Sequence, residues 1–248
     1  MSSPEEVSTR CIGDSWTLHK ELKSISLTPV EHGCLTSFRL IALTNGTVSR
    51  LLKALTLPNV QDLGLFSLGS YPSWNNDALH VFITRIGTSL RILNLCGISE
   101  YKDEIHGILQ RCPNVSRFTL VADFLADGFL EQFTGRTGFI MDISGRNGKL
   151  YLSRLVSIEL DAKISFTPKG FSSFIKSMFN RKDSLSSTSL RSLIIRCRGV
   201  TPQFINSEVF EELRRYQEQG RVIRIDTEYA PLFPRPSLLI RRFPERSR

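Results

Sequence analysis

The sequence LRILNL, residues 90–95, carries the pattern that decides the fold of this 248-residue chain. Its order is Leu or Val, two residues, an apolar residue, one residue and a second apolar residue. The same pattern occurs six times along the chain. Its copies begin at Leu35, Val60, Leu90, Val115, Leu155 and Leu190. Apolar residues alternating with period two are typical of a strand with one buried face. Each copy therefore predicts a short strand.

Between these copies the apolar spacing changes to the 3.6-residue period of a helix. This spacing predicts helices over residues 48–55, 79–86, 105–112, 171–179 and 209–216, where the last stripe includes Phe210, and a less regular one over 124–133. Thr167 followed by Pro168 predicts the start of the helix over 171–179, since threonine caps helices and proline favours their first turn. The chain thus alternates strand and helix, which makes the fold class α/β.

We expect a leucine-rich-repeat solenoid of irregular strand–helix units, with the parallel sheet on its concave face. One unit cannot bury its own apolar side, whereas stacked units can. The alternative is a doubly wound α/β sheet. That alternative is disfavoured because no Gly-rich phosphate loop follows any strand, and because strands buried on both faces read as near-continuous apolar runs.

The expected boundaries divide the chain into three parts. Residues 1–19 form a poorly ordered N-terminal segment or truncated cap, 20–228 the repeat domain, and 229–248 a disordered Pro/Arg-rich tail. A weaker copy of the pattern at residues 22–27 predicts an end strand whose pairing is left open. Asn147-Gly148 predicts a β-hairpin, either a contact loop or a tolerated insertion.

The joints Leu57-Pro58-Asn59-Val60 and Arg111-Cys112-Pro113-Asn114-Val115 resemble the repeat joints of leucine-rich-repeat F-box proteins, in particular the fungal F-box and F-box-like proteins. The last helix and strand, residues 210–225, resemble the end of that array. The resemblance implies the substrate-recognition part of a ubiquitin-ligase adaptor. The F-box itself is not found, so docking to the ligase scaffold is expected only if an F-box lies upstream.

Charge and motifs narrow the function classes. The net charge is +8, and half of this excess lies in residues 231–248, which hold five arginines and one glutamate. Nucleic-acid binding by the body of the chain is therefore not expected, although the basic tail could bind nucleic acid or an anionic surface.

No catalytic, cofactor or metal-binding motif is present, so we expect a non-enzymatic protein with no cofactor. The five cysteines form no metal or disulfide pattern, and no apolar run is long enough to span a membrane. We expect a cytoplasmic or nuclear protein.

The polar positions of the repeat predict the binding surface. Side chains alternate across a strand, so the residues between the buried positions face the concave side of the sheet. The candidate residues for contact with a protein partner are Arg39, Asp62, Phe66, Ile92, Asn94, Arg117, Thr119, Glu159, Asp161, Ile194 and Arg196. Pairing of Glu159 and Asp161 with arginines of neighbouring strands is an equally open interpretation.

Overall fold

The structure is a computed structural model that describes residues 10–12, 15–19, 30–42, 45–67, 76–98, 102–131, 133–134, 154–180, 190–198 and 203–227. Three predicted features lie outside the described residues: the weak strand copy at 22–27, the hairpin around Asn147-Gly148 and the tail, 229–248.

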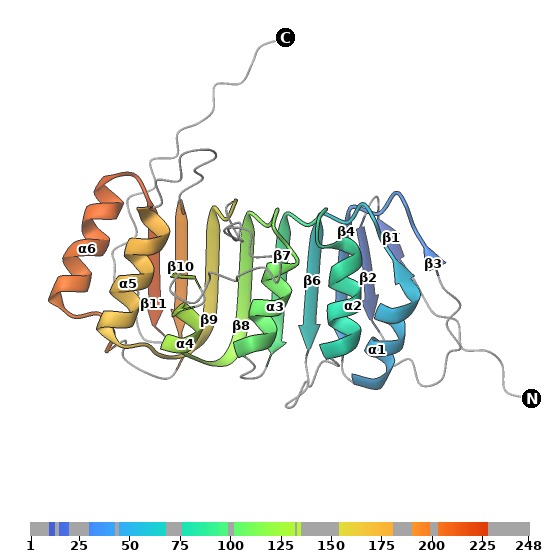
Figure 1. The fold of residues 1–248 in the computed structure, drawn as a ribbon, viewed down its shortest axis with the longest axis horizontal. Coiled ribbons are helices and arrows are strands. Elements are labelled where there is room, and N and C mark those ends of the chain that lie inside the picture. The colour runs from blue at the N-terminus through green and yellow to red at the C-terminus, as the bar shows by residue number, and fades with distance from the viewer. Residues whose placement is uncertain are drawn as a thin grey trace, which may run out of the picture.

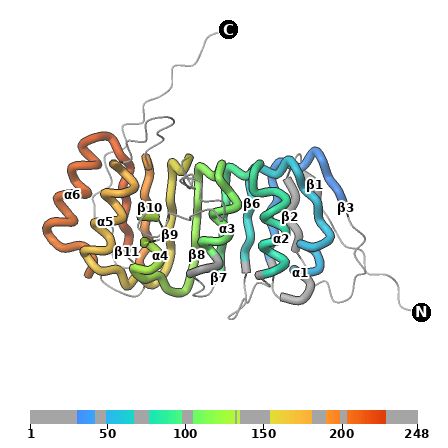
Figure 2. Tube along the Cα trace, in the orientation of Figure 1, coloured from blue at the N-terminus to red at the C-terminus, as the bar shows by residue number. Residues whose placement is uncertain are grey.

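One open sheet organises the described residues. It holds nine strands in the order in which they occur in the chain: β1 (Arg10–Ile12), β2 (Ser15–His19), β4 (Ser37–Ala42), β6 (Asp62–Ser67), β7 (Ile92–Ile98), β8 (Arg117–Ala126), β9 (Ser157–Ser165), β10 (Ser192–Cys197) and β11 (Val222–Thr227). The strands β1 and β2 are antiparallel, and every other neighbouring pair is parallel. A separate small parallel sheet joins β3 (Val30–Glu31) and β5 (Leu55–Thr56). The colour gradient in Figure 2 shows that units adjacent in the chain are adjacent in space.

The helices cover one face of this sheet. They are α1 (Asn45–Ala54), α2 (Asn76–Ile86), α3 (Lys102–Gln110), α4 (Asp127–Glu131), α5 (Pro168–Phe179) and α6 (Ser207–Glu218). All six lie in front of the strands in Figure 1. A doubly wound sheet places helices on both faces and breaks the chain order of its strands. Neither occurs in the described residues, which confirms an α/β fold with an open, mainly parallel sheet.

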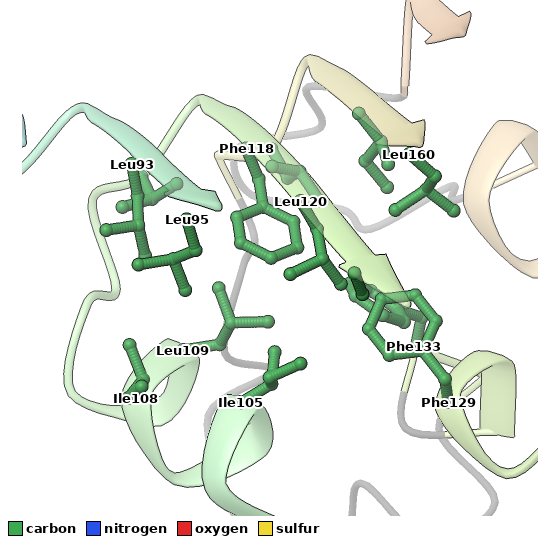
Figure 3. Close-up of a cluster of buried hydrophobic side chains, with 14 of the residues drawn as sticks. Leu93, Leu95, Ile105, Ile108, Leu109, Phe118, Leu120, Phe129, Phe133 and Leu160 are labelled. Carbon is green, nitrogen blue, oxygen red and sulfur yellow. The ribbon is translucent and has the colours of Figure 1, made fainter. Parts of the chain in front are cut away.

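The core lies between the sheet and the helices. All eighteen apolar positions of the six sequence copies are at most 4% exposed. Figure 3 shows one section of this core, in which Leu95 and Phe118 of the sheet face Leu109 of α3. The predicted helical stripe of α2 is buried in the same way, from Leu79 to Ile86. The apolar residues of the strands, which recur with period two, therefore pack against those of the helices, which recur with period 3.6, in one continuous apolar layer.

The same pair of hydrogen bonds joins successive strands at five consecutive steps, from β4 to β10. The carbonyl of Thr36, one residue after the first apolar position of its copy, accepts from the backbone N–H groups of Gln61 and Asp62 at 2.8 and 3.1 Å. The equivalent carbonyls of four later copies each accept two consecutive N–H groups of the next strand; these are the carbonyls of Gln61, Arg91, Ser116 and Val156. The spacing pattern thus corresponds to a repeated local geometry.

The two Pro-Asn joints add a second recurring contact. The side-chain amides of Asn59 and Asn114 donate to the carbonyls of Gly33 and Thr88, each at 2.6 Å. Both acceptors stand 26 residues before their donors, two residues ahead of a strand copy. These asparagines satisfy a carbonyl in the preceding unit and fix the step from one unit to the next.

The predicted helix over residues 124–133 is wrong in its first three residues. Strand β8 runs on to Ala126, and only the short α4 follows it. The register of β8 against β9 shifts between Val121 and Phe124, where Asp123 and Phe124 are both exposed. This irregularity breaks the period of two, so the buried positions before and after it differ in phase. Phe210, placed on the apolar stripe of the last helix, is also exposed, at 38%.

The sheet also begins earlier than predicted. Strands β1 and β2 lie within residues 1–19, which were expected outside the repeat domain, and β2 pairs in parallel with β4. Trp16 and Leu18 are in register with Phe38 and Leu40. The position three residues before Trp16 holds Gly13 in place of Leu or Val, so the pattern missed this strand.

The predicted start of α5 is confirmed. Thr167 is its N-cap and accepts a hydrogen bond from the Gly170 N–H at 3.0 Å, and Pro168 begins the helix. The Asp127 carboxylate accepts from both the backbone N–H and the hydroxyl of Thr167, at 2.8 and 2.5 Å. This contact ties the start of α5 to the start of α4.

Candidate functional site

The face of the main sheet opposite the helices is the candidate site, and we call it the open face. It carries every second side chain of the strands, and on β4 to β10 the register arranges these in three rows that cross the strands. The first row is Ser37, Asp62, Ile92, Arg117, Ser157 and Ser192. The second row is Arg39, Gly64, Asn94, Thr119, Glu159 and Ile194. The third row is Ile41, Phe66, Cys96, Val121, Asp161 and Arg196. All eleven predicted contact residues lie in these rows.

The β9–β11 part of the open face is occupied by mutual charge pairs. Arg196 is hydrogen-bonded to Glu159, and the Arg198 Nε donates to Asp161 Oδ1 at 2.6 Å. On the last strand, the Arg224 Nε donates to Asp226 Oδ1 at 2.8 Å, and this contact raises the pKa of the Arg224 guanidinium. The predicted lateral pairing is therefore present for both Glu159 and Asp161. These carboxylates and arginines largely neutralise one another.

The β4–β8 part of the open face has a looser arrangement of charges. Asp62 lies 3.7 Å from the guanidinium of Arg39 and accepts a hydrogen bond from the amide of Asn94 at 3.3 Å. Arg117 is exposed, and its guanidinium has no ion-pair or hydrogen-bond partner among the residues that the structure describes. The nearby Glu159, which was a possible partner, is taken by Arg196. Within the three rows of this part, two arginines therefore stand against one carboxylate.

An apolar row crosses the same strands. Ile41, Phe66, Cys96 and Val121 are neighbours in register on β4, β6, β7 and β8, and each is half-buried. Burial raises the pKa of the Cys96 thiol, and the charge of Asp161 adds to this effect against that of Arg198. The row is thus a continuous strip of apolar surface bordered by charged groups.

The ring of Phe66 lies over Gly64, in the middle of this part. A Cβ at Gly64 would stand 2.7 Å from Cε2 of Phe66 and 3.2 Å from Cγ of Arg39. A side chain at position 64 would therefore push the ring away. The bare backbone of Gly64 lets the aromatic ring lie down on the sheet beside the stem of Arg39.

Sequence reasoning missed two features of the open face. Arg198 was not among the candidates, although it is the partner of Asp161. The apolar row was not recognised as continuous, because its members come from strands 25 to 30 residues apart. Writing the third row out in register would have shown it. Among the described residues there is no group of three or more His, Cys, Asp or Glu side chains that could hold a metal ion.

Comparison with known proteins does not assign the chain to a family. A search of protein-family models and a search of curated proteins each return no match. Within the described part of the chain, no helix has both the length and the apolar character needed to cross a membrane.

Proposed function

We propose that this chain is a leucine-rich-repeat solenoid that recognises a protein partner on the open face, without catalysis of its own. The single observation that carries the proposal is the layout of this face. Strands follow one another in chain order, the described helices all lie on the opposite face of the sheet, and the open face carries both a half-buried apolar row and an arginine whose side chain has no partner among the described residues. Protein interfaces favour such a combination, since aromatic residues and arginine supply most of the binding energy.

The recurring hydrogen bonds support the solenoid part of the proposal. At five successive steps from one strand to the next, one backbone carbonyl accepts hydrogen bonds from two consecutive N–H groups. Two of these steps also have the same contact from an asparagine side chain. Repeated joints of this kind are what a stack of equivalent units requires. The steps differ in length because the segments between the strands differ, not because the joints differ.

We further propose, on the resemblance of the Pro-Asn joints, that the partner is a substrate delivered to a ubiquitin ligase. Docking to the ligase scaffold needs an F-box, and the test is the coding sequence upstream of Met1. An in-frame three-helix module that opens with a Leu-Pro segment supports the adaptor role, and a stop codon directly upstream contradicts it. A cytoplasmic or nuclear location fits this role, since Cys34, Cys96, Cys112 and Cys197 are all free thiols.

The double variant Arg117→Glu with Phe66→Ala is expected to reduce partner capture about tenfold. It removes the aromatic platform and reverses the charge of Arg117, the arginine of the three rows whose side chain has no partner among the described residues, while both side chains lie outside the core. The midpoint of thermal unfolding should change by less than about 3 °C. Affinity capture from the native cell type, quantified by mass spectrometry beside a thermal melt, measures both quantities.

The matched control is the double variant Lys169→Glu with Val81→Ala, at two exposed positions of α5 and α2. It also reverses one positive charge and truncates one apolar side chain, but on the helix side of the sheet. This variant should capture the partner as the unmodified chain does. Equal loss of capture in the two double variants, or a large drop in the unfolding midpoint of the first, assigns Arg117 and Phe66 to the fold and contradicts the proposal.

A further inference from the structure

We propose that the part of the open face from β4 to β8 binds an extended acidic peptide segment, with an aromatic side chain placed between two carboxylates. This inference rests on the proposed function and specifies the chemistry of the partner.

The charge pattern selects an acidic partner. In the β9–β11 part, each carboxylate already holds an arginine, so a ligand there would have to break existing pairs. Within the three rows of the β4–β8 part, Arg39 and Arg117 stand against the one carboxylate of Asp62, which also accepts a hydrogen bond from Asn94. Arg39 and Asp62 are 3.7 Å apart, which leaves the donors of this arginine largely available. A carboxylate that reaches either arginine gains a charge-assisted and potentially bidentate contact.

The aromatic element follows from Phe66. Its ring lies on Gly64 between the strands that carry the two arginines, with Ile92 and Cys96 on the next strand. Aromatic pairs and aromatic–aliphatic contacts stabilise an interface beyond the area they bury. An aromatic side chain placed on this platform would also cover the apolar row.

The spacing follows from the geometry of the sheet. Arg39 on β4 and Arg117 on β8 are separated by three strand-to-strand steps, about 14 Å at roughly 4.8 Å each. An extended peptide covers this distance in about four residues, and its residues i, i+2 and i+4 point to the same side. The expected partner segment is therefore acid–x–aromatic–x–acid, laid across the strands.

Other classes of ligand fit less well. Nucleic acid needs a row of cations against successive phosphates, whereas the arginines of the β9–β11 part are already paired. A basic peptide would meet Arg117 and Arg39 with like charge. Outside the three rows, Asp123 of β8 and Lys163 of β9 are both exposed and carry opposite charges.

The experiment uses the full chain and three fluorescein-labelled twelve-residue peptides of otherwise Gly/Ser sequence. The first contains Glu-Ser-Phe-Ser-Glu, the second replaces both glutamates with lysine, and the third replaces the phenylalanine with alanine. Fluorescence anisotropy at low ionic strength should show the first binding about tenfold tighter than either of the others. Arg117→Glu should weaken the first about tenfold and strengthen the lysine peptide, whereas Lys169→Glu, of the same charge change on the helix side, should alter either by less than twofold.

Three results would overturn this inference: equal affinity for the acidic and lysine peptides, equal effects of Arg117→Glu and Lys169→Glu, or no binding of the acidic peptide by the folded chain. The proposed function fails separately. If the peptides are not distinguished but the double variant on the open face still loses its cellular partner, only the acidic chemistry is wrong. If capture is unaffected as well, recognition on this face is wrong.

Discussion

Replacing Phe118 with alanine is expected to lower the free energy of unfolding by about 3–5 kcal/mol. Phe118 stands on β8, in the middle of the main sheet, and is 1% exposed. Its ring lies between Leu95 and Leu120 and faces α3 across the layer shown in Figure 3. Truncation removes the ring and leaves a cavity that neighbours on both strands cannot fill without moving. Chemical denaturation followed by circular dichroism measures this loss.

The matched control is Thr119→Ala, one residue further along the same strand. Thr119 points to the open face and is only half-buried, so its loss should cost less than about 1 kcal/mol. The loss of unfolding free energy in Phe118→Ala should be at least about three times that in Thr119→Ala, as expected for a strand with one buried face. Similar losses at both positions would mean that the second face is packed too, which contradicts the arrangement described here.

The variant Gly87→Ala is expected to destabilise the chain by about 3 kcal/mol. Gly87 follows α2, and a Cβ there would stand 2.1 Å from the backbone oxygen of Arg111 and 2.8 Å from that of Ile83. Backbone atoms cannot rotate away as a side chain does. The end of α2 would have to move away from Arg111, which follows α3. This movement would disturb the contact between two successive units.

The control for this variant is Gly33→Ala. No atom lies within 4 Å of the position that a Cβ would take at Gly33, and its carbonyl remains available to Asn59. Its free energy of unfolding should change by less than about 0.5 kcal/mol. A loss at Gly87 no greater than that at Gly33, in the same denaturation experiment, would show that α2 and the joint after α3 approach less closely than described.

The sequence was most informative where burial imposes a strict period. Leu63 and Leu65 had to point to the same side of one strand, and Phe82 and Ile83 to the same side of one helix, so their positions followed from spacing alone. The pattern failed where the chain departs from its period. Phe124 and Leu125 suggested a helix because the register shift in β8 puts an exposed pair of residues inside the strand.

The candidate face was predicted as a set of residues, and pairing of its charges across strands was expected, but the individual partners were not. Alternation along each strand places Glu159 and Arg196 on the same side, and the register places them near each other. Which carboxylate an arginine chooses depends on side-chain conformation: Arg196 reaches diagonally to Glu159, so Asp161 pairs with Arg198 instead. The ring of Phe66 over Gly64 is likewise a property of the packed structure, since it needs a neighbour without a side chain.

The most direct test of the open face is thiol labelling of single cysteines introduced on both sides of β8 and β9. Thr119→Cys and Ser157→Cys point to the open face, whereas Ala122→Cys and Ala162→Cys point into the core, where the native alanines are at most 4% exposed. Native Cys112 is an internal reference, because burial raises the pKa of its thiol to about 12 and keeps it unreactive in the folded chain. Exposed Cys34 is the reference for a reactive thiol.

N-ethylmaleimide labelling of the native variants at pH 7, followed by mass spectrometry, gives the four rates. The thiols at 119 and 157 are expected to react at a rate near that of Cys34, while those at 122 and 162 stay as protected as Cys112 until the chain unfolds. Protection of all four thiols would place a covering layer on the open face, and would contradict the claim that this face is available to a partner.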